Sequence, residues 1–139
     1  MVVKFTDLHD AFLFVDVDGG MSGNEAFLCL ETGKIYLHSE IADADELPDD
    51  IENDGKYLPI PNKRQLELDT RLVFGFTRKF LPADAEEIED FFRRKGGYAK
   101  FKRLLDDRRA LDQWRAFETQ AEEAALRAWC LEHSIDVID

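Results

Sequence analysis

The stretch Phe91–Cys130 constrains the fold most, because it holds the longest helical periodicity of the chain and both of its tryptophans. Apolar residues recur every three or four positions over Leu111–His133, which predicts one long amphipathic helix. Upstream, Gly96 and Gly97 end an earlier helical run, because glycine readily adopts the left-handed conformation that closes a helix. A further helix should begin near Tyr98. We expect the rest of the protein to pack around this stretch.

Basic residues are concentrated in the segment 93–109, which contains eight of them against two acidic residues. Six of the eight form the candidate interaction surface, called the basic surface below: Arg93, Arg94, Lys95, Lys100, Lys102 and Arg103. Tyr98 and Phe101 share helical spacing with two leucines, so we expect both rings to point into the core. Basic residues interleaved with aromatic ones can hold a nucleic-acid backbone. A solvated basic helix face with its rings turned inward suits an acidic protein surface instead.

The net charge of -12, from 18 basic and 30 acidic residues, restricts the classes of partner. Nucleic acids and anionic membranes are polyanions, so this charge opposes general binding to either. Rings that point inward would also remove the stacking platform that single strands need. The sequence therefore predicts another protein as the partner and no membrane. Nucleic acid, bound through the segment 93–109, is the alternative.

Apart from a short segment at Asp16 and Asp18, the sequence has no recognisable motif for catalysis, a cofactor or a metal. We therefore predict no cofactor and no metal site, and we favour a non-catalytic protein. The chain has no Walker loop, no GxGxxG, no HExxH and no CxxC. Cys29 and Cys130 are predicted to be reduced thiols of a cytoplasmic protein, where disulfides do not persist. Lys4 and Asp7 interrupt the first apolar patch, so no signal peptide is expected, and no apolar run reaches membrane-spanning length.

Short strands are predicted in the N-terminal half, about 1–61, and helices in the C-terminal half, about 62–139. A helix over 7–17, with Thr6 as N-cap, precedes the strands. The predicted strands cover 24–30, 34–38 and 56–60, with a hairpin turn at 31–33 and a last short strand at 135–137. Capping boxes predict helices that start after Asn62, running to Phe80, and after Asp84. With 139 residues, one domain is expected. The predicted fold class is α+β, a small antiparallel sheet packed with C-terminal helices.

The segment 40–54 is strongly acidic, with eight acidic residues and no basic one. Its spacing does not match the ligand pattern of an EF-hand loop. Like charges repel one another, so the segment is predicted to be a solvated, mobile loop.

Asp16 and Asp18 follow an apolar run and resemble the first motif of haloacid-dehalogenase-type phosphatases. In that motif the first carboxylate attacks phosphorus and the second acts as general acid and base, with magnesium neutralising charge. The motif requires a strand inside a parallel sheet, whereas helical spacing precedes Asp16 and a predicted hairpin follows Asp18. A small phosphohydrolase is therefore the third hypothesis.

A set of short segments spreads over nearly the whole chain: 7–12, 24–28, 31–35, 46–51, 57–61, 94–101 and 111–114, with Trp129 beyond them. Together these segments resemble a bacterial family known as UPF0158, uncharacterised protein family number 0158. The family form has alanine where this chain has Gly97, a difference that we expect to cost little at a helix start. The resemblance implies no activity, and it implies that Asp16 and Asp18 are not a family catalytic motif.

Overall fold

The computed structural model describes residues 1–17, 23–40 and 47–139. The described chain divides into two units. Unit 1 comprises 1–66 together with 125–139, and unit 2 comprises 67–124. The fold is α+β, as predicted, with helices, a three-stranded antiparallel sheet and a parallel pair of strands.

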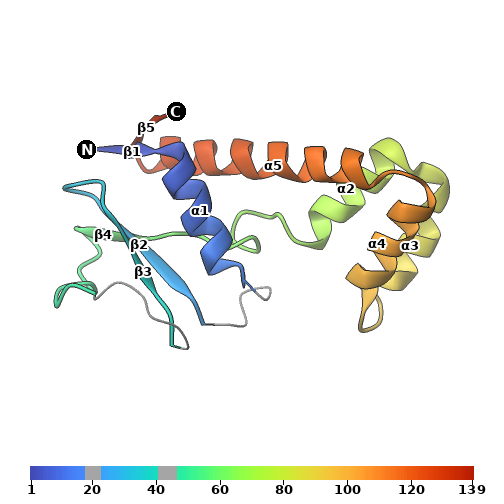
Figure 1. Ribbon diagram of the computed structural model, residues 1–139, viewed down its shortest axis with the longest axis horizontal. Coiled ribbons are helices and arrows are strands. Elements are labelled where there is room, and N and C mark those ends of the chain that lie inside the picture. The colour runs from blue at the N-terminus through green and yellow to red at the C-terminus, as the bar shows by residue number, and fades with distance from the viewer. Residues whose placement is uncertain (18–22, 41–46) are drawn as a thin grey trace. The chain divides into compact units, whose positions relative to one another are not determined.

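Unit 1 is built on the antiparallel sheet of β2 (Glu25–Cys29), β3 (Ile35–His38) and β4 (Tyr57–Pro59). The strand order is β3-β2-β4, so the proline-containing strand β4 lies at an edge, where a missing N–H does not interrupt the ladder. Helix α1 (Phe5–Val15) lies against β2 and β3 (Figure 1). Its buried face consists of Leu8, Ala11, Phe12 and Val15, which recur at helical spacing.

The two ends of the described chain pair with each other in unit 1. Strand β1 (Val2–Lys4) runs parallel to β5 (Asp136–Ile138), beside the N- and C-termini in Figure 1. The last turn of helix α5 (Leu111–Glu132) closes when the Ile135 amide donates to the Cys130 carbonyl at 2.8 Å, and Ser134 takes a positive φ of 58°. The chain thereby leaves the helix and enters β5.

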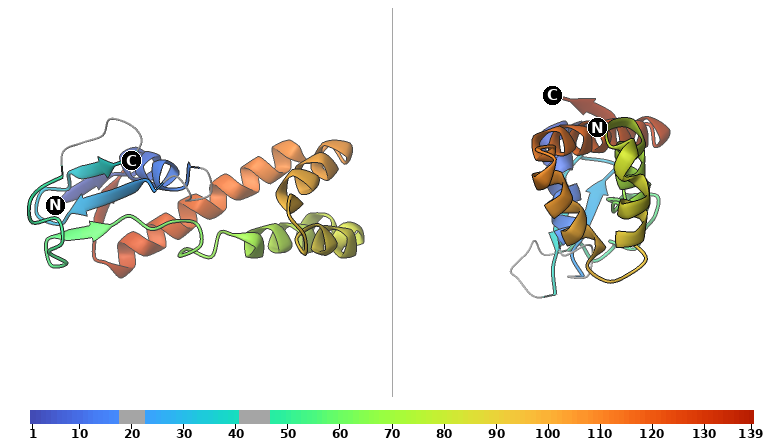
Figure 2. Two further views of the ribbon diagram at one scale, coloured as in Figure 1. Left: turned by 90° about the horizontal axis from the view of Figure 1, so that it is seen from below. Right: turned by 90° about the vertical axis from the view of Figure 1, so that its right-hand side faces the viewer.

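Unit 2 contains α2 (Thr70–Phe80), α3 (Ala85–Phe91), α4 (Gly97–Asp107) and the first part of α5. Helix α3 packs on α2 and α4, which can be followed in both views of Figure 2. Its core is largely aromatic and aliphatic: Val73, Phe76, Ile88, Phe101, Leu104, Leu105, Ala110 and Trp114 are buried together. The helical periodicity of the sequence therefore correctly predicts residues that form the core of this unit.

Two predicted helix starts are wrong. Asn62 and Gln65 do form the reciprocal bonds of a capping box, at 2.8 and 3.0 Å, but only turns follow. Glu67 has a positive φ of 60°, which an α-helix does not accommodate. Helix α2 therefore starts only at Thr70, with Asp69 as its N-cap. Helix α1 begins at Phe5, one residue before the predicted cap Thr6. The prediction there missed that β1 runs straight into α1.

The predicted acidic loop lies partly outside the described residues, which omit 41–46. The described remainder contains hydrogen-bonded turns, and Asp50 accepts bonds from Lys56 Nζ at 3.0 Å and from the Tyr57 hydroxyl at 3.1 Å. The hydrogen bond from Lys56 is the main reason that the pKa of Asp50 lies below its usual range. The predicted mobility of 40–54 stays a prediction.

Candidate interaction surface

A glycine turn between α3 and α4 positions the basic surface. Gly96 has a φ of 79°, in the left-handed region that glycine adopts without steric cost. Gly97 opens α4 and lies against the end of α3: a Cβ there would be 2.5 Å from the carbonyl oxygen of Phe91. The turn is therefore tight, and three cations of the basic surface precede it while three follow it on α4.

The basic surface is open to solvent over most of its extent. Five of its six cations are exposed and Lys102 is half-buried. Arg93 has a long ion pair with Asp90, at 3.7 Å. Lys102 Nζ lies 5.3 Å from the centre of the Tyr98 ring, a cation–π distance. Within the described part of the chain, Arg94, Lys95, Lys100 and Arg103 have no ion-pair partner, so these four charges are available to a ligand.

Tyr98 contradicts the prediction that both rings of this segment point inward. Phe101 is fully buried, as predicted, but 45% of Tyr98 is exposed. The helix explains the difference, because residues three positions apart are separated by about 60° around the axis. Tyr98 therefore lies on the flank of α4, next to Lys102, rather than at the centre of the buried face. The prediction that this surface has no exposed ring for stacking on a base is therefore wrong.

A shallow pocket of about 250 Å³ lies between α3 and α4, at one side of the basic surface. Its apolar lining comes from Phe91 and Leu104, and its charged residues are Lys100, Arg103, Glu87 and Asp107. The sequence predicted neither the two carboxylates nor the apolar lining of this pocket. Glu87 and Asp107 lie twenty positions apart in the sequence, and they line one pocket only because α3 packs on α4.

Two flanks of α4 therefore offer different chemistry. Lys100 and Arg103 border the pocket, whereas Tyr98 and Lys102 lie one turn apart on the other flank. The first flank combines both signs of charge with an apolar lining. The second presents one aromatic ring beside an ammonium group.

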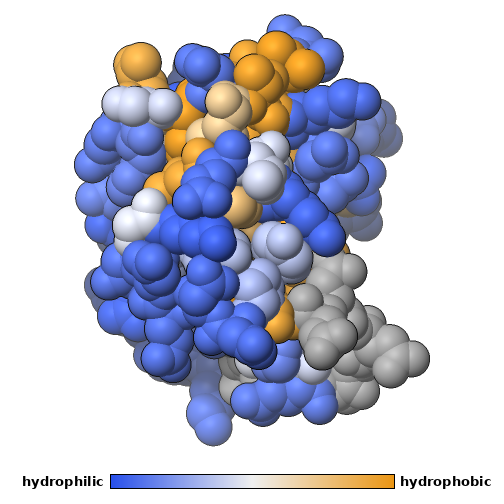
Figure 3. All heavy atoms as spheres, turned by 90° about the vertical axis from the view of Figure 1, so that its left-hand side faces the viewer, coloured by the Kyte–Doolittle hydropathy of each residue, from blue (hydrophilic) through white to orange (hydrophobic). Residues whose placement is uncertain are grey.

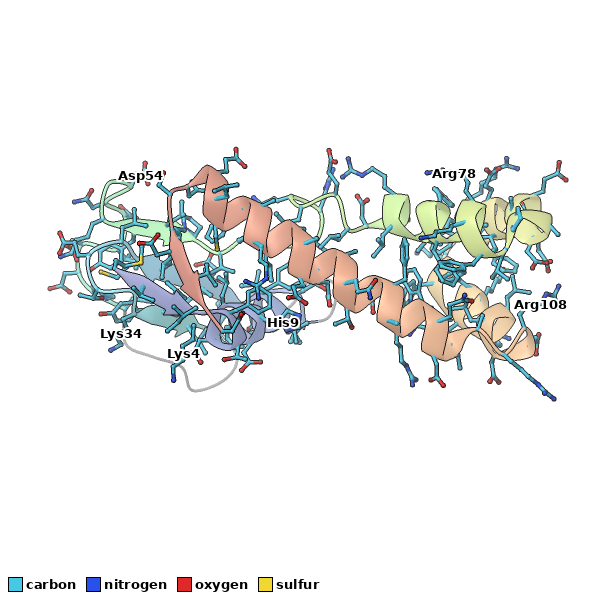
Figure 4. All side chains as sticks on the ribbon, turned by 90° about the horizontal axis from the view of Figure 1, so that it is seen from above. Lys4, His9, Lys34, Asp54, Arg78 and Arg108 are labelled. Atoms are coloured by element: carbon cyan, nitrogen blue, oxygen red, sulfur yellow. The ribbon has the colours of Figure 1, made fainter. Side chains whose placement is uncertain are left out.

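An ion pair links the end of α4 to the residue that precedes α3. Arg108, which closes α4 and is labelled in Figure 4, donates two hydrogen bonds to the Asp84 carboxylate, at 2.9 and 3.2 Å. Asp84 therefore does not cap α3 through its side chain, in contrast to the predicted capping box. The hydrogen bonds from Arg108 hold the pKa of Asp84 below its usual value.

We expect Arg108→Gln to lower the urea midpoint slightly at neutral pH and to have no effect in acid. The Asp84 carboxyl has a depressed pKa in the folded state. Its contribution to stability is therefore fully present above the unfolded pKa of about 3.9 and is lost progressively as the pH falls from there through the lower folded pKa. Urea titrations at a series of pH values measure the difference. The matched control is Arg109→Gln, because Arg109 is a neighbouring exposed arginine that forms no ion pair with Asp84 among the described residues. A difference that persists unchanged to pH 3 would contradict this account.

The phosphatase-like residues are only partly described. Asp18 lies outside the described residues. Asp16 ends helix α1, rather than a strand, and its carboxylate lies 3.4 Å from Lys63 Nζ. Over the ranges that the structure describes, no three His, Cys, Asp or Glu side chains converge as metal ligands. Cys29 and Cys130 are both free and buried.

Charge differs sharply between the two units. Unit 1 carries six of the 18 basic and 17 of the 30 acidic residues, a net charge of -11, and unit 2 carries the remaining twelve and thirteen, a net charge of -1. The described helices include none that is both long and apolar enough to cross a bilayer. The negative charge that argued against polyanion binding thus resides mainly in unit 1, not around the basic surface.

The fold and the surface define an α+β protein with a basic helical patch. No family model, no curated protein and no solved structure matches the chain. The resemblance to UPF0158 stays a prediction.

Proposed function

We propose that the chain is a non-catalytic interaction module whose basic surface binds an acidic segment of a partner protein. The pocket between α3 and α4 carries this proposal. It places two cations, Lys100 and Arg103, beside an apolar lining from Phe91 and Leu104. An acidic segment with one apolar side chain can bury that side chain in the pocket while its carboxylates contact the two cations.

The mixed charge of the pocket favours a protein over a uniform polyanion. Glu87 and Asp107 line the same pocket as the two cations. A phosphate backbone would bring negative charge against these carboxylates, which is unfavourable. A protein segment can direct backbone N–H groups or a lysine toward them and its own carboxylates toward Lys100 and Arg103. The pocket thus selects for a pattern of charge, which proteins can supply.

The test is affinity capture from a nuclease-treated lysate, followed by direct binding measurements with the captured protein. We expect wild type to retain a protein that Lys100→Glu/Arg103→Glu loses, with at least a roughly tenfold lower affinity, because two attractive contacts become repulsive. Arg78→Glu/Arg115→Glu is the matched control, since both arginines are exposed residues of unit 2 away from the pocket lining. A captured protein that binds wild type and both variants equally would contradict the proposal.

Single-stranded nucleic acid is the second candidate, favoured by the exposure of Tyr98. An exposed ring beside Lys102 can stack on a base while cations of the basic surface contact phosphates. Fluorescence anisotropy with labelled single-stranded RNA and duplex DNA tests this function. Binding only in the non-specific range, about 10⁻⁴–10⁻⁶ M at physiological salt, agrees with the protein partner. Submicromolar binding that is lost in both Tyr98→Ala and Lys100→Glu/Lys102→Glu/Arg103→Glu would replace it.

We also propose a cytoplasmic location and membership of UPF0158. The support for the location is that Cys29 and Cys130 are both free, which suits a reducing compartment. The support for the family is the set of short matching segments in the sequence.

A further inference from the structure

A groove lies in unit 1, far along the sequence from the basic surface. It has a volume of about 400 Å³ and lies between α1 and the hairpin that leads into β3. Ala11, Ile35 and Leu37 form its apolar part, and Asp7 and Asp10 project from α1 beside it. Lys34 also lines it and points outward from unit 1 in Figure 4. The groove therefore combines an apolar floor with two carboxylates and one lysine.

The carboxylates of this groove are available for binding. Asp7 and Asp10 are exposed, and within residues 1–17, 23–40 and 47–139 neither has a cation within 4.0 Å. Because Asp7 and Asp10 are three positions apart on α1, their Cβ atoms lie about 5–6 Å from each other on one face of the helix. The surrounding unit is strongly negative, and the face in Figure 3 is mostly hydrophilic with apolar atoms gathered toward its top. An occupant must therefore bring an apolar or aromatic side chain together with positive charge.

The basic surface supplies that combination on the flank of α4 away from its pocket. Tyr98 is the only aromatic residue among the exposed large hydrophobic side chains of the described chain. Lys102 lies one helical turn beyond it, a spacing close to that between Asp7 and Asp10. We propose that the groove of one copy holds the Tyr98–Lys102 flank of a second copy, with Tyr98 against Ile35 and Leu37 and Lys102 at the carboxylates.

Charge determines the symmetry of this contact. Two copies of unit 1, each with a net charge of -11, repel each other face to face, whereas unit 1 attracts the segment 93–103, which has six cations and no acidic residue. The copies therefore associate head to tail, through two different surfaces. Lys100 and Arg103 lie on the other flank of α4, so this inference does not depend on the acidic partner proposed above.

Sedimentation velocity over a range of protein concentrations tests the contact, with two complementary variants. Asp7→Lys/Asp10→Lys destroys the groove and keeps the flank, whereas Tyr98→Ala/Lys102→Glu destroys the flank and keeps the groove. We expect wild type to self-associate. The affinity of this association should fall roughly tenfold or more at high salt, because the contact is between exposed charges. Each variant alone should be monomeric. Their equimolar mixture should form a one-to-one complex, because one intact groove then meets one intact flank.

The matched control is Asp49→Lys/Glu52→Lys, which makes the same charge change at exposed carboxylates of unit 1 outside the groove. It should self-associate like wild type, and thermal unfolding should show that all variants are folded. Three results would each overturn the proposal. They are a wild type that is monomeric at every concentration, a groove variant that associates like wild type, and a mixture of folded variants that stays monomeric. The last result would point to a different cationic occupant of the groove.

Discussion

Replacing Trp114 with alanine should lower the free energy of unfolding by about 3–5 kcal/mol, the range for truncating a buried aromatic side chain. Trp114 is 1% exposed and lies in the core of unit 2. Its ring meets Phe76 and Phe101 edge to face, with centroids 5.2 and 5.1 Å away, and stacks on Phe117 at 6.4 Å. Alanine would leave these three rings facing a cavity. Urea unfolding followed by circular dichroism measures the loss.

Trp114→Phe shows in the same experiment how much of the loss comes from the packing of the ring. Trp114 Nε1 is buried without a hydrogen-bond acceptor among the described residues. Phenylalanine removes this N–H and part of the ring volume but no hydrogen bond, so it should cost clearly less than alanine. A urea midpoint of Trp114→Ala within error of wild type would show that the tryptophan is not part of the core.

The sequence predicted the helical core because periodicity and burial coincide along α4 and α5. Phe101 and Trp114 were placed correctly, since each lies at the centre of its apolar stripe. Tyr98 was placed wrongly because it lies at the margin of the stripe, where the position of the neighbouring helix decides exposure. Glu67 shows a second limit: a capping box at Asn62 predicts a helix, but the positive φ of Glu67, two residues after Gln65, interrupts the pattern before α2.

The candidate site was predicted only as a set of cations. All six are solvent-accessible to some degree, as a charged run next to a glycine turn suggests. The pocket could not be predicted, because Glu87 comes from α3 and Asp107 from the end of α4. The groove of unit 1 has the same origin, since α1 supplies its carboxylates and the β3 hairpin its apolar floor. Both concave surfaces form where two secondary-structure elements pack together, and the local sequence does not encode which elements pack.

The segregation of charge between the units changes the meaning of the net charge. A value of -12 suggests a molecule that repels polyanions everywhere, but screening limits such repulsion to about 8–10 Å at physiological salt. Unit 2, with a net charge of -1, presents the basic surface with little opposing field of its own. The choice between a protein and a nucleic-acid partner therefore rests on the local pattern around Lys100 and Tyr98, and the two binding experiments address each of these residues.

Gly97→Ala should destabilise the protein more than Gly96→Ala, although Gly96 is the glycine with a positive φ. A Cβ at Gly97 would lie 2.5 Å from the Phe91 carbonyl oxygen, 2.9 Å from its carbon and 3.0 Å from Phe92 Cα. These are backbone atoms, so relief requires α3 and α4 to separate, at a cost of about 1–3 kcal/mol or more for overpacking. At Gly96 a Cβ meets nothing within 4 Å, and only the conformational cost of about 1 kcal/mol remains.

The ranking of the two variants also tests the resemblance to UPF0158, whose usual form has alanine at the position of Gly97. From the position at a helix start we expected that alanine costs little there, whereas the contact with Phe91 predicts a substantial loss. Urea midpoints of Gly96→Ala and Gly97→Ala, measured side by side, distinguish the two expectations. If the urea midpoint of Gly97→Ala equals that of wild type, the turn between α3 and α4 has more room than the 2.5 Å between a Cβ at Gly97 and the Phe91 carbonyl oxygen indicates. The family form then fits this chain. If Gly97→Ala loses more stability than Gly96→Ala, the close approach holds the basic surface in place, and this chain has a tighter turn than that form allows.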